Sequence, residues 1–328
     1  MLKKDIGLLI LILVVGTVVA IINPLFISPI NIANTANLVG LFGIFAIGQA
    51  FVIITGGIEL SVGSIIALLG VLFVDLMVNH GVPWPVALGI MLALGAVMGL
   101  AHGLLITKLH LQPFIVTLCG LLIYRGAARY YTADGTAGFA FGDSFPTLEW
   151  LTTGRTFGIP HSMFAFVVIA VVMWVVLHRS VFGRYLFAVG KNEEAARYSG
   201  VPTNRVIVAS YVICGVLTAI SAIFFAMYTR SISPSSHGNF YELYAIAASV
   251  LGGFSLRGGE GSIVGVVLGT ILLQILQNLV NLLGIPSSLN FAVMGSVILI
   301  GVLADTQFAE YRKRKAAAKG AAAGRAPA

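Results

Sequence analysis

Charged side chains are scarce in this 328-residue chain. Asp, Glu, Lys and Arg together make up 9% of it, whereas hydrophobic residues make up 58%. A soluble domain carries about 25% charged residues, so this chain has too few of them to cover a water-facing surface. The composition excludes an ordinary soluble globular protein and indicates that lipid is the main solvent.

The sequence also lacks the patterns that carry covalent, metal or nucleotide chemistry. Its two cysteines, Cys119 and Cys214, lie within apolar runs and form no CxxC pair, which favours apolar packing. It has no H-E-x-x-H, no G-x-S-x-G and no His/Cys cluster with zinc spacing. A phosphate loop, G-x-x-x-x-G-K-[ST], is missing too, since Asn192 follows Gly190-Lys191. We therefore expect no enzyme activity, no metal site and no cofactor in this chain.

Apolar runs are what the chain has in abundance. Runs of about 20 residues recur along it, the length that crosses a bilayer as a helix. Lipid admits only helices or closed barrels, and uniformly apolar runs favour helices over alternating barrel strands. We expect an all-α, polytopic integral membrane protein with about ten transmembrane helices, some of them broken or re-entrant. The expected spans are residues 6–24, 32–55, 61–79, 84–107, 113–131, 161–178, 203–229, 240–256, 262–284 and 287–304. The first is read as a retained anchor, because its apolar core exceeds that of a signal peptide and no A-x-A site follows.

Basic residues predict the orientation of these spans. With ten spans and a cytosolic N-terminus, the positive-inside rule can be tested on all nineteen Lys and Arg residues. Fifteen fall on the cytosolic side: Lys3, Lys4, Lys108, Arg179, Arg184, Lys191, Arg197, Arg205, Arg257, Arg312, Lys313, Arg314, Lys315, Lys319 and Arg325. Only Arg125, Arg129, Arg155 and Arg230 remain outside. Both termini are therefore expected in the cytosol, and the net charge of +7 reflects this rule and anionic membrane lipid rather than nucleic acid.

One membrane domain is expected over residues 1–310, with a cytosolic loop over 179–203. A basic tail rich in Ala and Gly follows over 311–328, and residues 132–160 form the one sizeable outer loop. Two Gly-interrupted segments, 56–64 and 252–262, resemble each other and break apolar runs, as segments at a transport pathway often do.

Glycines at four-residue spacing predict close helix packing. Such a stripe lets another helix backbone approach, which indicates intramembrane packing rather than chemistry. The glycines concerned are Gly95, Gly99 and Gly103 in one run and Gly261, Gly265 and Gly269 in another.

Polar residues inside the apolar runs are candidates for a translocation pathway, because they are costly there. Acids at these positions either line the route or brace a broken helix, and His102 either binds solute or packs in a hydrogen-bonded site. Gln274, Gln277, Asn278 and Asn281 share one helix face, which meets either a partner helix or a watery pathway. The candidates are Glu59, Ser61, Asp75, Glu242, Tyr244, Gln274, Gln277 and Asn278.

A short charged helix is predicted between two long spans. Asn192 suits the N-cap, Glu193 and Glu194 fall in the positive first turn, and Gly200 suits the left-handed C′ position before Pro202. So short a helix is marginal alone, so it either docks against a partner or lies on the lipid headgroups.

This segment carries a specific resemblance. Glu194-Ala195-Ala196-x-x-x-Gly200 looks like the EAA---G coupling segment of ABC importer permeases. The whole chain resembles the ribose-type sugar permease family of ABC importers over residues 30–305. Four landmarks stand in order: 55–64 (TGGIELSVGS), 112–118 (QPFIVTL), 192–202, and 245–247 (AIA) through 252–253 (GG). Glu59 and Tyr244 depart from it, standing where Asp is common, and Lys191 replaces a small or polar residue.

The resemblance implies a permease subunit of a bacterial inner-membrane importer. It implies that a partner ATPase holds ATP and Mg²⁺, that an extracytoplasmic binding protein delivers a monosaccharide-like solute, and that a second permease subunit completes the pathway. The segment implied to couple to the ATPase comprises Asn192, Glu193, Glu194, Ala195, Ala196 and Gly200. The alternative is a secondary transporter driven by an ion gradient, which would explain the buried acids and broken helices but not the EAA-like segment.

Overall fold

The structure, a computed structural model, describes residues 2–286, 289, 292, 295–296 and 299. The chain divides into two compact units, Met1–Gly284 and Ile285–Ala328, and every helix and strand named below belongs to the first. The predicted span 287–304 lies almost entirely outside the described residues, and the tail 311–328 lies wholly outside them.

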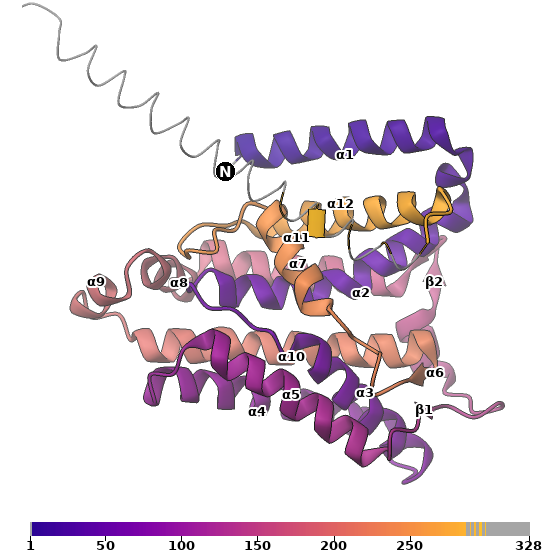
Figure 1. The fold of residues 1–328 in the computed structure, drawn as a ribbon, viewed down its shortest axis with the longest axis horizontal. Coiled ribbons are helices and arrows are strands. Elements are labelled where there is room, and N and C mark those ends of the chain that lie inside the picture. The colour runs from indigo at the N-terminus through magenta and orange to yellow at the C-terminus, as the bar shows by residue number, and fades with distance from the viewer. Residues whose placement is uncertain (1, 287–288, 290–291, 293–294, 297–298, 300–328) are drawn as a thin grey trace, which may run out of the picture. The chain divides into compact units, whose positions relative to one another are not determined.

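Helices dominate the first unit (Figure 1). The longer ones are α1 (Leu2–Ile22), α2 (Pro29–Ile53), α3 (Val62–Val78), α4 (Trp84–Lys108), α5 (Pro113–Tyr131), α7 (His161–Arg179), α10 (Thr203–Thr229) and α12 (Ile263–Leu282). The shorter ones are η1 (Pro24–Ile27), α6 (Pro146–Thr153), α8 (Val181–Lys191), α9 (Glu193–Tyr198) and α11 (Tyr241–Leu251). Four two-residue strands complete it: β1 (Ala137–Gly138), β2 (Arg155–Thr156), β3 (Ile159–Pro160) and β4 (Ser231–Ile232).

Helical membrane architecture, as predicted, is confirmed. Each of the nine predicted spans before residue 285 coincides with one of these helices, and six helices are long and apolar enough to cross a membrane. The expected span 240–256 is shorter than predicted, because Gly252 and Gly253 end α11 after 11 residues. A helix of that length cannot cross a bilayer, which takes about 20 residues.

Local sequence sets where the helices begin and end. Proline occupies the first position of α2 and α5, where its missing amide hydrogen costs no helical bond. The Ser28 side chain caps α2 by accepting a hydrogen bond from the backbone amide of Asn31. The pair Gly56-Gly57 follows the last turn of α2 and begins an extended segment that reaches α3. The first predicted Gly-interrupted segment is therefore a real break between two helices.

Helix α2 forms the centre of the bundle. It packs against α7, α10, α11 and α12, and most of its residues from Asn37 onwards are buried. Glycine makes this density possible, since a Cβ at Gly43 would overlap the ring of Phe166 on α7. Helix α10 links this core to α3 and α4.

The connections gather at two opposite ends of the bundle (Figure 1). At one end, β1 pairs with β4 in an antiparallel ladder, and Arg230 forms an ion pair with Glu149 of α6. At the other end lie α8 and α9, together with the loops that follow α2 and α11. The basic side chains predicted to be cytosolic between Lys108 and Arg257 belong to this second end.

Candidate functional site

Helix α9 carries the end caps that the sequence predicted. The Asn192 side-chain oxygen accepts a hydrogen bond of 2.9 Å from the Ala195 amide. At the other end, the Val201 amide bonds the Ala196 carbonyl and the Gly200 amide bonds the Arg197 carbonyl. This pair of bonds is a Schellman motif, and it requires the left-handed backbone that Gly200 adopts at φ +83°. The capped helix is thereby confirmed, at six residues.

The side chains of α9 divide into an outer face and an inner face. Glu194 and Ala195 are exposed, and Glu193 forms an i,i+4 ion pair with Arg197 at 2.6 Å. Ala196, which the resemblance placed in the segment that couples to the ATPase, is buried, because α9 rests on α8 and α10. Tyr198, which sequence reasoning did not single out, is 92% exposed. The surface open to a partner therefore includes Glu194, Ala195 and Tyr198.

The end of α8, which leads through Asn192 into α9, meets both Gly-interrupted segments. The Gly259 amide donates to the carbonyl of Ile54 at the end of α2, and a Cβ at Gly190 would overlap that same carbonyl. Lys191 holds Glu260 in an ion pair of 2.7 Å. The end of α8 therefore connects α9 to the breaks that precede α3 and α12.

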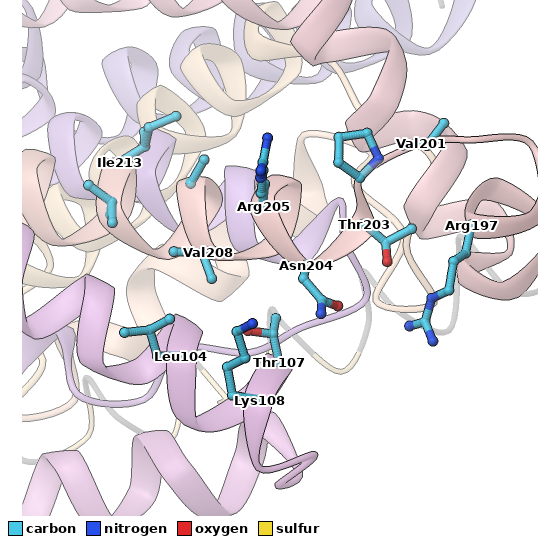
Figure 2. Close-up of a pocket in the computed structure, with 13 residues that line it drawn as sticks. Leu104, Thr107, Lys108, Arg197, Val201, Thr203, Asn204, Arg205, Val208 and Ile213 are labelled. Atoms are coloured by element: carbon cyan, nitrogen blue, oxygen red, sulfur yellow. The ribbon is translucent and has the colours of Figure 1, made fainter.

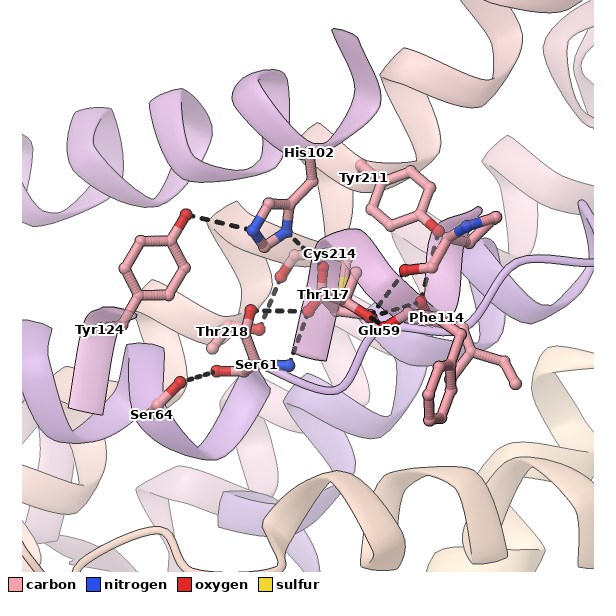
Figure 3. A network of polar contacts seen from close by, with 12 residues as sticks. Glu59, Ser61, Ser64, His102, Phe114, Thr117, Tyr124, Tyr211, Cys214 and Thr218 are labelled. Atoms are coloured by element: carbon pink, nitrogen blue, oxygen red, sulfur yellow. Dashed lines mark hydrogen bonds and ion pairs between the residues drawn. The ribbon is translucent and has the colours of Figure 1, made fainter. Parts of the chain in front are cut away.

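A buried polar network lies just beyond the first break (Figure 3). Glu59 Oε1 accepts hydrogen bonds from the amide and the hydroxyl of Ser61, at 2.7 and 2.6 Å. Glu59 Oε2 lies 2.7 Å from Nδ1 of His102 on α4. The opposite nitrogen of His102 meets the Tyr124 hydroxyl of α5 at 3.1 Å. The carboxylate thus ties the break to two neighbouring helices, and both of its oxygens are occupied.

Backbone groups around Glu59 are held as well. The Tyr211 and Thr117 hydroxyls both donate to the carbonyl of Ile58, at 3.3 and 3.2 Å. In the amide orientation that satisfies both of its polar atoms, Gln49 bonds the backbone N–H and C=O of Glu59. The sequence could not reveal this set, because Gln49, His102, Thr117 and Tyr211 stand in four separate apolar runs.

The two other acids occupy different surroundings. Asp75, near the end of α3, accepts hydrogen bonds from Tyr131 at 2.6 Å and Asn79 at 2.7 Å and joins α3 to α5. Glu242 is buried at the start of α11, with its carboxylate against Gly63 on α3. Arg125 lies in the same region, where it donates to the carbonyls of Pro234 and His237. These contacts brace helix junctions, and a role in a pathway stays a prediction.

The polar face of α12 contains both paired and unpaired amides. Asn278 forms a reciprocal amide pair with Asn31 of α2, at 2.8 and 3.0 Å. The Oε1 atoms of Gln274 and Gln277 are buried and find no hydrogen-bond partner within the described part of the chain. Such acceptors favour a place on a polar route, whereas Asn278 serves helix packing.

The predicted glycine stripes lie at close helix contacts, with one exception. A Cβ at Gly95 or Gly99 would overlap carbonyl oxygens of α10, and one at Gly103 would crowd Val208. Gly265 and Gly269 stand against the backbone of α11 and of Gly252 in the same way. Gly261 differs, because it precedes α12 in the loop and faces the Phe254 ring.

The sequence of this chain matches a known protein family over most of its length. The family model described as "Branched-chain amino acid transport system / permease component" matches residues 31–302. The chain belongs to this family. The EAA-like segment and its three companion motifs predicted a ribose-type importer permease. This prediction is confirmed.

Named relatives of this permease cover nearly its whole length. It is 37% identical to the ribose import permease protein RbsC of Escherichia coli (strain K12) over 305 residues, 93% of each chain. It is 42% identical to the protein of the same name in Bacillus subtilis (strain 168), over 91% of this chain and 90% of that one. Its identity to the galactose/methyl galactoside import permease protein MglC of Haemophilus influenzae is 31%, over 96% and 97%. No solved structure matches the permease.

Proposed function

We propose that this chain is the membrane-spanning subunit of an ATP-driven importer of a monosaccharide-like solute. The observation that carries the proposal is α9, a helix capped at both ends that exposes Glu194 and Tyr198 beyond the helix bundle. A six-residue helix is marginal alone, and both caps fix its position for docking. The ATPase subunit is the partner it fits, and ATP and Mg²⁺ belong to that subunit.

The base of α9 suggests how ATP hydrolysis would reach the transport pathway. At the end of α8, directly before α9, Lys191 pairs with Glu260 in the loop before α12, and Gly190 packs against the carbonyl of Ile54 after α2. The extended segment from Gly56 leads directly to Glu59 and its network. Displacement of α9 by the ATPase would therefore pull on both helix breaks together, and the tightly packed helices between them would transmit the shift.

The solute class rests on the relatives' names and on the chemistry of the polar face. The relatives are named for the import of ribose, galactose and methyl galactoside, and of autoinducer 2. A sugar offers several hydroxyl donors, and the buried oxygens of Gln274 and Gln277 are acceptors without a partner in the described structure. Glu242 and Tyr244 lie near this route at α11. A solute-binding protein would deliver the sugar from outside, and a second permease subunit would complete the channel.

The orientation that goes with this function has about ten passes through a bacterial inner membrane, with the loop after α11 completing the pass at 240–256, and both termini in the cytosol. Its support is the predominance of basic residues at one end of the bundle. Reporter fusions test it: fusions after Ala140 should report the outside, and fusions after Lys191 and Lys315 the cytosol. A cytosolic signal at Ala140 would overturn the span count.

Reconstitution with partner subunits tests the function itself. The permease, co-purified with its genomic-neighbour ATPase, is placed in vesicles with the neighbouring binding protein. Loaded binding protein should raise ATP hydrolysis and drive uptake without an ion gradient. The alternative, a secondary transporter, predicts uptake that needs no ATP and stops when a protonophore or sodium ionophore collapses the gradient.

A further inference from the structure

A groove at the α9 end of the bundle has no role in the proposed mechanism. It measures about 860 Å³ and runs between the last turns of α4 and the first turns of α10 (Figure 2). Its walls along the helices are apolar and include Leu104, Val208 and Ile213. Leu104 is 40% exposed, so this wall is open to its surroundings.

The mouth of the groove is basic. Lys108 at the end of α4 and Arg205 in the first turn of α10 line it, and both are exposed. Neither forms an ion pair with another residue that the structure describes. Arg197 of α9 also lines the mouth, although Glu193 already engages it. Among the described residues, the lining contains no Asp or Glu.

We propose that this groove binds an anionic phospholipid. Its phosphate would lie at Lys108 and Arg205, beside Asn204, and an acyl chain would follow Leu104 and Val208. The basic mouth matches the phosphate of such a lipid, and the apolar walls match its acyl chain. Basic pockets at the cytosolic ends of transmembrane helices are known to bind acidic head groups. Because Arg197 belongs to α9, a bound lipid would also hold α9 against α4 and α10.

Other occupants fit the groove less well. A soluble partner would have to fill apolar walls that run along two membrane helices. A second copy of this permease would bring the same cations to the mouth. The inference rests on the proposed orientation, which places this end at the cytosolic leaflet, but its test needs no ATP hydrolysis.

Photolabelling of the intact importer in vesicles tests the proposal. Matched phosphatidylglycerol and phosphatidylcholine carry a diazirine on one acyl chain, and labelled peptides are read by mass spectrometry. We expect phosphatidylglycerol to label peptides of α4 and α10 in preference to phosphatidylcholine. Lys108→Gln/Arg205→Gln should lower that labelling by about fivefold for each cation removed. Lys108→Arg should retain it.

Two controls keep the outcome unambiguous. Arg257→Gln removes an exposed cation from the same end of the bundle but outside the groove, and it should label like the wild type. Phosphatidylcholine labelling should stay equal in all variants, which shows that they are folded. Equal labelling by both lipids, or wild-type labelling of the double variant, would overturn the proposal. The proposal would also be overturned if neither lipid labelled the groove and Leu104→Cys cross-linked two copies of the permease. Failure of the ATPase to co-purify would instead count against the proposed function alone.

Discussion

The carboxylate of Glu59 lies 2.7 Å from the Nδ1 atom of His102, and both side chains are only 3% exposed although 43 positions separate them. The pair joins the segment between α2 and α3 to helix α4. Both of its oxygens are engaged, one by His102 and the other by Ser61. This arrangement favours the bracing role over direct contact with solute, because the carboxylate is buried and both of its oxygens already have partners.

Glu59→Ala should therefore destabilise the permease as a whole. It leaves His102 and the Ser61 amide buried without their partner, and removing one member of a buried pair costs about 3–5 kcal/mol. We expect a clear fall in the melting temperature and yield of the purified protein. Glu59→Gln, which keeps an acceptor in place, should lose less. Glu194→Ala serves as the control, since that acid is exposed. Full stability of Glu59→Ala with impaired uptake would return Glu59 to the pathway.

Two glycines on α4 should respond in opposite ways to the same change. A Cβ at Gly99 would overlap the carbonyl of Tyr211 on α10, whereas a Cβ at Gly89 meets nothing within 4 Å. Gly99→Ala should destabilise by about 1–3 kcal/mol, the usual cost of overpacking. Gly89→Ala should be neutral or gain up to about 1 kcal/mol of helix propensity. Thermal unfolding of both variants measures the contrast, and equal melting temperatures would show that α4 and α10 are not in close contact.

The sequence predicted the positions of the helices better than the contacts between them. Hydropathy located a helix at each of the nine predicted spans before residue 285, because a helix in lipid needs only a long apolar run. Local capping rules located α9, since Asn192 and Gly200 act on their own backbone neighbours. The Glu59–His102 pair and the Asn31–Asn278 pair could not be predicted in this way, because each depends on which helices pack together. Burial of Ala196 was missed for the same reason.

Neighbouring amides on α12 should separate transport from stability. Gln277 keeps an unpaired buried oxygen, while both polar atoms of the Asn278 amide are engaged by Asn31. Gln277→Leu should lower uptake by about two- to tenfold, the effect of one lost hydrogen bond, and leave the protein folded. Asn278→Leu should instead cost about 1–3 kcal/mol of stability, because it strands the Asn31 amide. Uptake at the wild-type rate in Gln277→Leu would remove this face from the pathway.

Energy coupling gives the sharpest test, because α9 can be altered without touching the membrane helices. Gly200 adopts φ +83° with open space around it, so a valine there meets backbone strain of about 1–3 kcal/mol rather than a clash. That strain should undo the Schellman bonds and misplace the exposed face of α9. Glu194→Arg should reverse an exposed charge on that face while leaving both caps intact.

Both variants should insert into the membrane at wild-type levels but recruit less ATPase, or recruit it without stimulation by loaded binding protein. The matched control is Gly142→Val, which places the same residue at another positive-φ glycine with open space, at the opposite end of the bundle. It should leave ATPase recruitment unchanged. The measurements are co-purification of the ATPase and ATP hydrolysis in vesicles. If Gly200→Val and Glu194→Arg both match the wild type in these two assays, α9 is not the coupling element. The ATP-driven mechanism would then have to act through another surface at this end of the bundle.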